Sequence, residues 1–260
     1  MRRLAPSRWA VLAFTLLLAA IPSCLHAVDA TPLRAEPASA SNIVIGFVGG
    51  FVRHDNPYHG PVRLAQSIRK EVTPETYVGV FENRRRRQAY ETVMRLLDSD
   101  RDGQLSDAEK ARARIVIYGH SWGAAAAVQL ARDLQRIGVP VLLTAQVDSV
   151  AKLWQNDSLI PANVAEAVNF YQTHGIVHGR ARIKASDPAK TAILGNYLLD
   201  YRKAPVRCEG TSWADRLFTP DHIESECDGH VWSQIEKLVR ELLAPSSTSA
   251  VVTTATNPQP

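Results

Sequence analysis

Apolar and polar positions alternate in two rhythms along the middle of the chain. Unbroken apolar runs such as 43–48 and 115–118 predict buried strands, whereas apolar residues three or four apart, as in 86–97, predict helices. The segments with either pattern are 43–48, 61–71, 77–81, 86–97, 115–118, 124–137, 139–147, 163–171 and 232–243. Strands that alternate with helices form βαβ units, and wholly apolar strands are typical of a sheet covered on both faces. The pattern predicts an α/β fold with a doubly wound, mostly parallel sheet and helices on both faces.

The two ends of the chain lack this core pattern. Residues 31–41 and 245–260 are rich in Ser, Thr, Pro and Ala, so we expect a flexible leader and a disordered tail. The fold is then expected within residues 42–244, a suitable size for one domain.

Residues 1–30 have the features of a secretory signal peptide. Arginines precede an uncharged run at 9–21, which is too short to cross a bilayer as a helix, and Val-Asp-Ala at 28–30 suits a cleavage site. We expect cleavage after Ala27 or Ala30 and export to the periplasm or the medium. The segment 21–24 also resembles a bacterial lipobox, so lipidation of Cys24 is the alternative, and the only route predicted to a membrane.

The basic charge of the chain is weak evidence for a nucleic-acid partner. The formal net charge is +4 and the pI about 9.0, but without residues 1–30 the chain keeps 27 basic and 25 acidic side chains. Four adjacent arginines at 84–87 accompany no recognition motif and are typical of a solvated helix start. We therefore expect no nucleic-acid partner.

A Gly-His-Ser-Trp-Gly sequence at 119–123 joins the apolar run 115–118 to a helical pattern that begins with four alanines. A serine on a sharp strand-to-helix turn exposes its hydroxyl, and the glycines on either side avoid collisions with the neighbouring strand and helix. The small residues let the helix lie close to the sheet, with its N-terminus directed at the serine oxygen. In this pattern the chain resembles the α/β-hydrolase superfamily, and the resemblance implies that Ser121 is a nucleophile.

The same resemblance implies an oxyanion hole. One donor would be the N–H of Trp122, after the nucleophile, and the other an N–H in the loop after an earlier strand. The Gly-Gly-Phe sequence at 49–51 follows the first predicted strand, which makes Gly50 or Phe51 the second donor.

The superfamily order of nucleophile, acid and histidine places the base downstream of Ser121. His222 lies in a Pro-containing loop shortly before the last amphipathic helix, where this histidine usually falls. His230, at the start of that helix, is the alternative, whereas His174 and His178 lie too early. We expect His222 to take the serine proton and later return it to the leaving group.

Two aspartates are candidates for the acid that orients the base. Asp148 directly follows the strand after the nucleophile helix, as in some lipase-like hydrolases, and Asp187 follows a later possible strand at 181–185. We favour Asp148 and keep Asp187 as the alternative.

Residues 98–109 (DSDRDGQLSDAE) match the EF-hand calcium loop at each position that its pattern specifies. Hard carboxylate oxygens are the ligands that calcium prefers, and the glycine at position 6 allows the sharp turn. The predicted ligands are Asp98, Asp100, Asp102, the Gln104 carbonyl, Ser106 through water and Glu109. A single loop argues against a paired calcium switch, so we expect a structural Ca²⁺ that fixes the segment leading to Ser121.

Cys208 and Cys227 are the only cysteines that remain if Cys24 leaves with the signal peptide. In an oxidising compartment an even pair favours a disulfide.

These features predict an exported protein, and the resemblance to the α/β-hydrolase superfamily implies a lipase- or esterase-like serine hydrolase. Its substrate would be a small-molecule or lipid ester or a thioester, cleaved by acyl transfer, and its cofactor Ca²⁺. The alternative is a non-catalytic calcium-binding or interaction protein on a hydrolase scaffold. His54, Asp55 and His59 are interpreted as loop polarity, with the mouth of the active site or a metal site as the alternative. His120 is interpreted as a packing residue or as one that supports the catalytic residues.

Overall fold

The computed structural model describes residues 37–210 and 219–244. The predicted signal peptide, most of the predicted leader and the predicted tail lie outside these residues. No helix in the described part of the chain combines the length and apolar character needed to span a bilayer.

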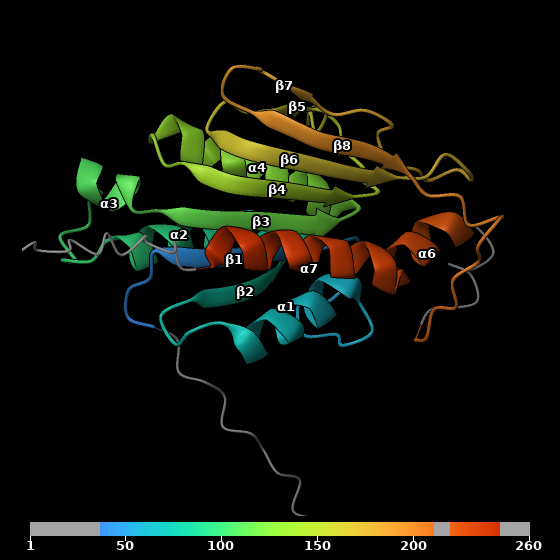
Figure 1. Ribbon diagram of the computed structural model, residues 1–260, viewed down its shortest axis with the longest axis horizontal. Coiled ribbons are helices and arrows are strands. Elements are labelled where there is room, and N and C mark those ends of the chain that lie inside the picture. Colours follow the sequence, from blue (N-terminus) through green and yellow to red (C-terminus); the bar gives the residue numbers. More distant parts are fainter. Residues whose placement is uncertain (1–36, 211–218, 245–260) are drawn as a thin grey trace, which may run out of the picture. The chain divides into compact units, whose positions relative to one another are not determined.

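A six-stranded sheet with the order β2-β1-β3-β4-β6-β8 forms the centre of the fold (Figure 1), and each neighbouring pair is parallel. Its strands are β1 (Asn42–Val48), β2 (Tyr77–Glu82), β3 (Arg114–His120), β4 (Val141–Val147), β6 (Val164–Tyr171) and β8 (Ala192–Leu198). The short strands β5 (Leu159–Ile160) and β7 (Lys184–Ala185) pair separately. The helices are α1 (Gly60–Glu71), the 3-10 turn η1 (Asn83–Arg85), α2 (Arg86–Leu97), α3 (Asp107–Ala111), α4 (Trp122–Arg136), α6 (Pro220–Cys227) and α7 (Gly229–Leu243).

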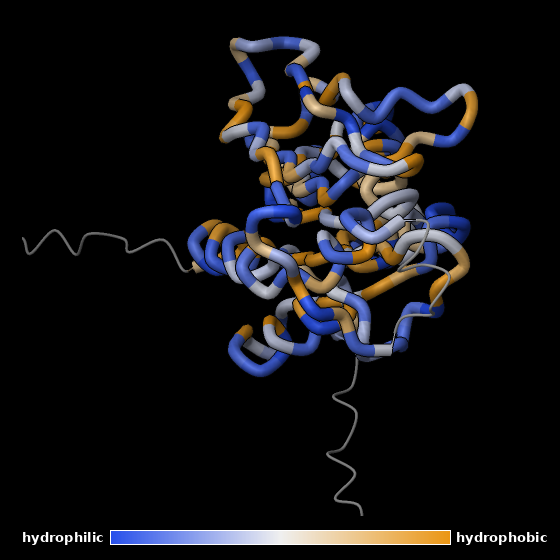
Figure 2. Tube along the Cα trace, turned by 90° about the vertical axis from the view of Figure 1, so that its right-hand side faces the viewer, coloured by the Kyte–Doolittle hydropathy of each residue, from blue (hydrophilic) through white to orange (hydrophobic). Residues whose placement is uncertain are grey.

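Helices cover both faces of the sheet. Successive side chains of a strand point to opposite faces, so each central strand contributes to two cores. Val44, Val116 and Leu143 face one core with α1 and α7, and Ile43 and Ile117 face a second core with α2 and α4. Figure 2 shows many hydrophobic positions in the central part of the trace, whereas its outer loops carry both hydrophilic and hydrophobic positions. The predicted fold class is confirmed.

The alternation of strands and helices ends after β4. Among the described residues no helix lies between β4 and β6 or between β6 and β8. Local polar bonds order the first of these connections instead: Asn156 Oδ1 accepts from Ser158 and Leu159. The edge strand β8 is consequently exposed, with Tyr197 and Leu198 about half accessible.

The sheet reverses its direction of growth beside β1, since β2 lies on one side of it and β3 on the other. In such sheets the crevice beyond the carboxyl ends of the strands at this point is the usual ligand site. The register pairs Phe47 with Gly119 and His120 with Val147, so these strands end at a common edge. The Gly-Gly loop after β1, Ser121 after β3 and Asp148 after β4 therefore meet there.

Candidate active site

Ser121 lies on a strained turn between β3 and α4. Its φ of 56° is in the left-handed region, which residues other than glycine rarely adopt, and such strain is typical of functional sites. The flanking glycines have no room for a side chain. A methyl group on Gly119 would lie 2.5 Å from the Gly123 backbone, and one on Gly123 would lie 2.4 Å from the Phe47 carbonyl. The buried alanines 124–127 bring α4 against β1, β3 and β4, so the turn has the geometry that the motif predicts.

The structure brings Ser121, His222 and Asp148 together in a chain of contacts. His222 Nε2 lies 2.9 Å from Ser121 Oγ, and His222 Nδ1 lies 2.6 Å from Asp148 Oδ2. His222 is 7% exposed, Ser121 8% and Asp148 0%. Because both ring nitrogens have partners, Asp148 can hold the tautomer that carries hydrogen on Nδ1 and leaves Nε2 free to accept the serine proton.

Asp148 is held by donors on the loop after β6. Its Oδ1 accepts from the Gly179 N–H at 2.5 Å and the Gln172 N–H at 3.3 Å, and its Oδ2 from the Gln172 side-chain amide at 2.8 Å. A methyl group on Gly179 would come within 2.4 Å of Asp148 Oδ1, so glycine is needed for this approach. Asp148, the acid that the sequence favours, thus accepts three hydrogen bonds besides its contact with His222.

The alternative acid and base lie elsewhere. Asp187 accepts from the Ala189 N–H within its own turn and pairs with Lys190. His230 is exposed at the start of α7, where its N–H donates to Asp228. His222 itself lies in the first turn of α6, a short helix, and not in the loop suggested by the proline before it.

The loop after β1 lies beside the serine. A methyl group on Gly49 would come within 2.9 Å of Ser121 Cβ, and Gly50 has a positive φ of 45° in a turn closed by the Val52 N–H and the Gly49 carbonyl. The ring of Phe51 packs edge-on against Trp122 at 5.6 Å. The N–H of Trp122 belongs to the first residue of α4, where helical N–H groups have no intrahelical acceptor. Both predicted donor segments therefore border the serine.

Asn83 and Lys152, which the sequence pattern did not single out, hold this loop. The buried Asn83 donates from Nδ2 to the Gly50 carbonyl at 2.6 Å and to the Val48 carbonyl at 3.4 Å. Lys152 Nζ donates to Asn83 Oδ1 at 2.6 Å and lies 5.0 Å from the centroid of the Trp122 ring. A polar residue directly after β2 was the only signal in the sequence that could have indicated Asn83.

The predicted calcium loop connects α2 to α3, and its aspartates converge. Oxygens of Asp98, Asp100 and Asp102 all lie within 4.8 Å of one another. Arg101 and Gly103 have φ of 63° and 83°, and Asp98 accepts from the Gly103 N–H, so the backbone turns sharply as the pattern requires.

Glu109 lies outside this cluster. Its carboxylate accepts from the N–H and hydroxyl groups of both Ser99 and Ser106, and the Ser106 side chain caps α3 in return. These hydrogen bonds lower the pKa of Glu109 to about 2, and the bond from the Ser99 hydroxyl has the largest effect. The fit to Ca²⁺ is thus good for the three aspartates, whereas Glu109 serves the helix cap in this structure.

Cys208 and Cys227 form the predicted disulfide. It ties the segment after β8 to the end of α6, the helix that carries His222. Three of the arginines at 84–87 form ion pairs: Arg85 with Glu82, Arg86 with Asp133 and Arg87 with Glu91.

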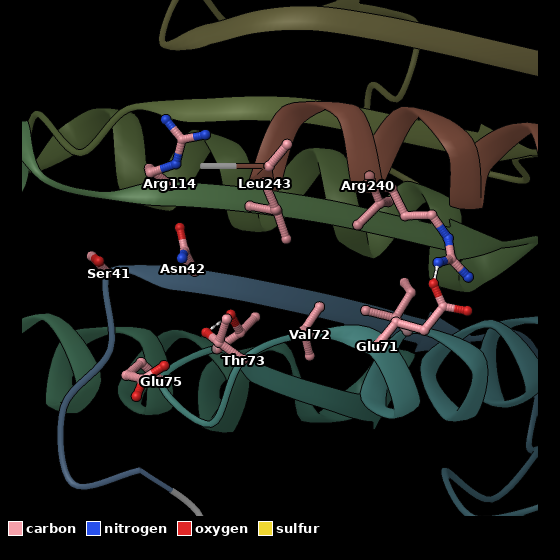
Figure 3. A pocket seen from close by; sticks show the side chains of 13 residues that line it. Ser41, Asn42, Glu71, Val72, Thr73, Glu75, Arg114, Arg240 and Leu243 are labelled. Carbon is pink, nitrogen blue, oxygen red and sulfur yellow. Dashed lines mark hydrogen bonds and ion pairs between the residues drawn. The ribbon is translucent and has the colours of Figure 1, made fainter. Parts of the chain in front are cut away.

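A separate cavity of about 620 Å³ lies at the amino ends of the strands, bordered by the ends of α1 and α7 (Figure 3). Asn42 and Arg114, which begin β1 and β3, line it together with Leu243. Since Ser121 follows the opposite end of β3, this cavity is not part of the Ser121 site.

No protein-family model and no curated protein matches the chain. Among solved structures, it is similar to RedJ with a PEG molecule bound in its active site, at 13% identity over 75% of this chain and 94% of that one, with a TM-score of 0.38. It is also similar to a YdeN-like hydrolase from Pectobacterium atrosepticum, at 12% identity over 77% and 92% of the two chains, with a TM-score of 0.37. A thermostable esterase from Pseudomonas putida gives 12% identity over 80% and 75%, also with a TM-score of 0.37. At such values an activity cannot be transferred, so the function must be inferred from the side chains of this chain.

Proposed function

We propose that this protein is an exported serine hydrolase that cleaves a carboxylic ester or thioester through an acyl-enzyme. The observation that carries the proposal is the buried contact chain from Ser121 through His222 to Asp148. A serine hydroxyl becomes a useful nucleophile when a base within hydrogen-bond distance removes its proton, and His222 Nε2 is at that distance.

In the proposed reaction Ser121 Oγ attacks the substrate carbonyl carbon while its proton passes to His222 Nε2. The carbonyl π electrons move to oxygen, and the N–H groups of Trp122 and of Gly50 or Phe51 stabilise this oxyanion. When the oxyanion collapses, the bond to the leaving group breaks and His222 returns the proton to the leaving oxygen or sulfur. Water, deprotonated by His222, then releases the acid in a second cycle of the same steps.

Asp148 keeps its charge throughout and stabilises the imidazolium of His222. Removing a carboxylate and an imidazole from water is costly unless each has partners. The donors from Gln172 and Gly179 meet this requirement for Asp148, so its charge can be retained in a buried site.

We also propose a structural calcium site at Asp98, Asp100 and Asp102, with the Gln104 carbonyl and Ser106 as further ligands. The three converging carboxylates support it, because without a cation they would repel one another. A bound ion would neutralise this charge and stiffen the connection from α2 to β3. Glu109 would complete the set only if its bonds to Ser99 and Ser106 opened.

Export is supported by the disulfide between Cys208 and Cys227, since such bonds persist in oxidising compartments. The signal peptide and the choice between cleavage and lipidation at Cys24 depend on residues outside the described part of the chain. Mass spectrometry of the mature N-terminus distinguishes a start after Ala27 or Ala30 from a lipidated Cys24.

A fluorophosphonate probe tests the enzymatic proposal without knowledge of the substrate. We expect covalent labelling of the folded, calcium-loaded protein, located at Ser121 by peptide mapping. The label should be absent in Ser121→Ala and retained in the control Ser233→Ala, whose hydroxyl bonds within α7. A wild-type protein that is folded yet unlabelled would favour the non-catalytic alternative. With labelling established, p-nitrophenyl esters from acetate to palmitate identify the preferred acyl length.

A further inference from the structure

A second buried acid lies behind the candidate base. Glu226 follows His222 by four residues in α6, a spacing that places both side chains on one face of the helix. Glu226 is 4% exposed, and none of the steps proposed above uses it. Because burying a charged side chain is costly, a carboxylate here calls for partners and a role.

Two imidazoles approach the Glu226 carboxylate from other elements. His59, which precedes α1, places Nδ1 2.6 Å from Glu226 Oε1, and His120, at the end of β3, places Nδ1 at 3.5 Å. His59 Nδ1 is thus the nearer of the two ring nitrogens to the carboxylate. The Trp232 ring nitrogen donates to the Glu226 main-chain carbonyl at 2.7 Å and fixes this turn of the helix.

His120 connects this cluster to His222. Its Nε2 lies 3.1 Å from the His222 main-chain carbonyl and 3.2 Å from Ser225 Oγ, while the Ser225 hydroxyl donates to the same carbonyl at 2.8 Å. A carbonyl can only accept, so Nε2 of His120 carries hydrogen and, in the neutral ring, Nδ1 does not. The centroids of the His120 and His222 rings lie 4.7 Å apart, with the rings tilted by 36°.

The charge state of the cluster follows from burial. Burial lowers the pKa of His120 to about 4, so this ring is neutral near pH 7. Burial also raises the pKa of Glu226, but the surrounding imidazoles, with His120 and His59 foremost, more than offset it, and the pKa lies below its ordinary value. Glu226 is therefore an anion, on the same face of α6 as His222.

We propose that Glu226 is a positioning residue of the hydrolase: its carboxylate lies beside His120, the residue that contacts the main chain of His222, and its charge stabilises the His222 imidazolium together with that of Asp148. The inference rests on the proposed function, because it assigns a role in that same site. It predicts that the protonation of His222 depends on two carboxylates, one in direct contact and one through the field of a buried charge.

Several other ionisable groups surround these residues and limit the choice of variants. They are His59 before α1, Arg63 on α1, whose guanidinium donates to the Cys227 carbonyl, His120 on β3, Asp148 after β4, and Asp221 on α6, which pairs with His174. Substitution of Glu226 alone leaves all of them in place.

The decisive variant is Glu226→Gln, which keeps the shape and removes the charge. We measure the rate of fluorophosphonate labelling of Ser121 against pH, with Glu224→Gln as the control. Glu224 lies on the same helix, but its carboxylate accepts from the Val206 N–H. For a charge at about helical i, i+4 distance, we expect the acid-side midpoint to fall by about one pH unit in Glu226→Gln. The control should move by less than about a third of that shift.

A fall of the acid-side midpoint distinguishes a positioning role of Glu226 from a role in the stability of the fold alone. Loss of structure would lower labelling at every pH, whereas loss of the Glu226 charge leaves the variant relatively more reactive at low pH. The plateau rate should also fall, by about threefold to tenfold, because the imidazolium is less stabilised. An unchanged midpoint, or equal shifts in both variants, would overturn the inference.

A direct titration distinguishes failure of the inference from failure of the proposed function. NMR of the His222 ring in Ser121→Ala, with and without Glu226→Gln, reports the same shift even if wild-type protein is never labelled. If Glu226→Gln does not fold, the wild-type Glu226 carboxyl carbon should show a second inflection at the pH where His222 titrates. Its absence would likewise overturn the inference.

Discussion

The Nε2 atom of His222 lies 2.9 Å from the Ser121 hydroxyl oxygen, although 101 residues separate them along the chain. The contact exists because α6 lies at the carboxyl edge of the sheet, where Ser121 follows β3 on a strained turn. The reactivity of such a pair depends on the groups that hold each partner in place.

Neutralising the acid should separate Asp148 from Asp187. Asp148→Asn leaves the shape but allows the wrong tautomer of His222, so we expect kcat to fall by roughly 10³- to 10⁴-fold. Asp187→Asn, in an exposed turn, should stay within about twofold of wild type, as most surface substitutions do. Ester hydrolysis by both variants is the measurement, and equal activities would contradict the assignment.

Removing the Asn83 amide should impair the oxyanion hole through the loop that it holds. Asn83→Ala frees the Gly50 carbonyl, and we expect kcat to fall about tenfold to 100-fold with little change in KM. The matched control is Asn163→Ala, because Asn163 also donates to two main-chain carbonyls, of Ala131 and Val139. Both variants should lose about 1–3 kcal/mol of unfolding free energy, but only Asn83→Ala should lose activity. Equal kcat values would argue against this role.

Calcium should stabilise the protein through the three aspartates. At millimolar Ca²⁺ we expect Tm to rise by about 2–4 °C over EDTA-treated protein, and this rise should disappear in Asp98→Ala. Asp107→Ala is the control, since Asp107 is fully exposed in α3 outside the cluster. Calorimetric titration checks binding directly. Glu109→Gln then distinguishes two roles of Glu109. If Glu109 is a calcium ligand, the substitution should lower the calcium affinity; if it serves the helix cap, the substitution should lower Tm without calcium as well.

The buried His120 should make the fold sensitive to acid. Its folded pKa of about 4 lies below the ordinary value of 6.5, so the unfolded chain takes up a proton first as the pH falls. The stabilisation is therefore complete above about pH 6.5 and is lost progressively down to pH 4, by roughly 3 kcal/mol in total. In His120→Gln, unfolding free energy should depend less steeply on pH across this range, whereas the exposed His230→Gln should follow wild type. Parallel curves for all three proteins would be evidence against a buried neutral imidazole.

The elements that the sequence determined by itself are those with strong local patterns. The apolar run before Ser121, the flanking glycines and the alanines after them dictate a strand, a tight turn and a close helix, because each choice depends on neighbours in the chain. The loop at 98–109 is also determined locally, because its turn is built from residues within 12 positions of one another. The cysteine pair followed from the small number of cysteines and the expected compartment.

Tertiary structure alone decided which distant residues meet. Asp148 and His222 are 74 residues apart, and the sequence pattern left Asp187 and His230 open as alternatives. The choice depends on strand order and on the path of α6, which local periodicity does not encode. The roles of Asn83 and Glu226 could not be predicted for the same reason: a buried amide or carboxylate is explained by the groups packed around it. These groups come from the loop after β1, the end of β3, the residue before α1, and α7.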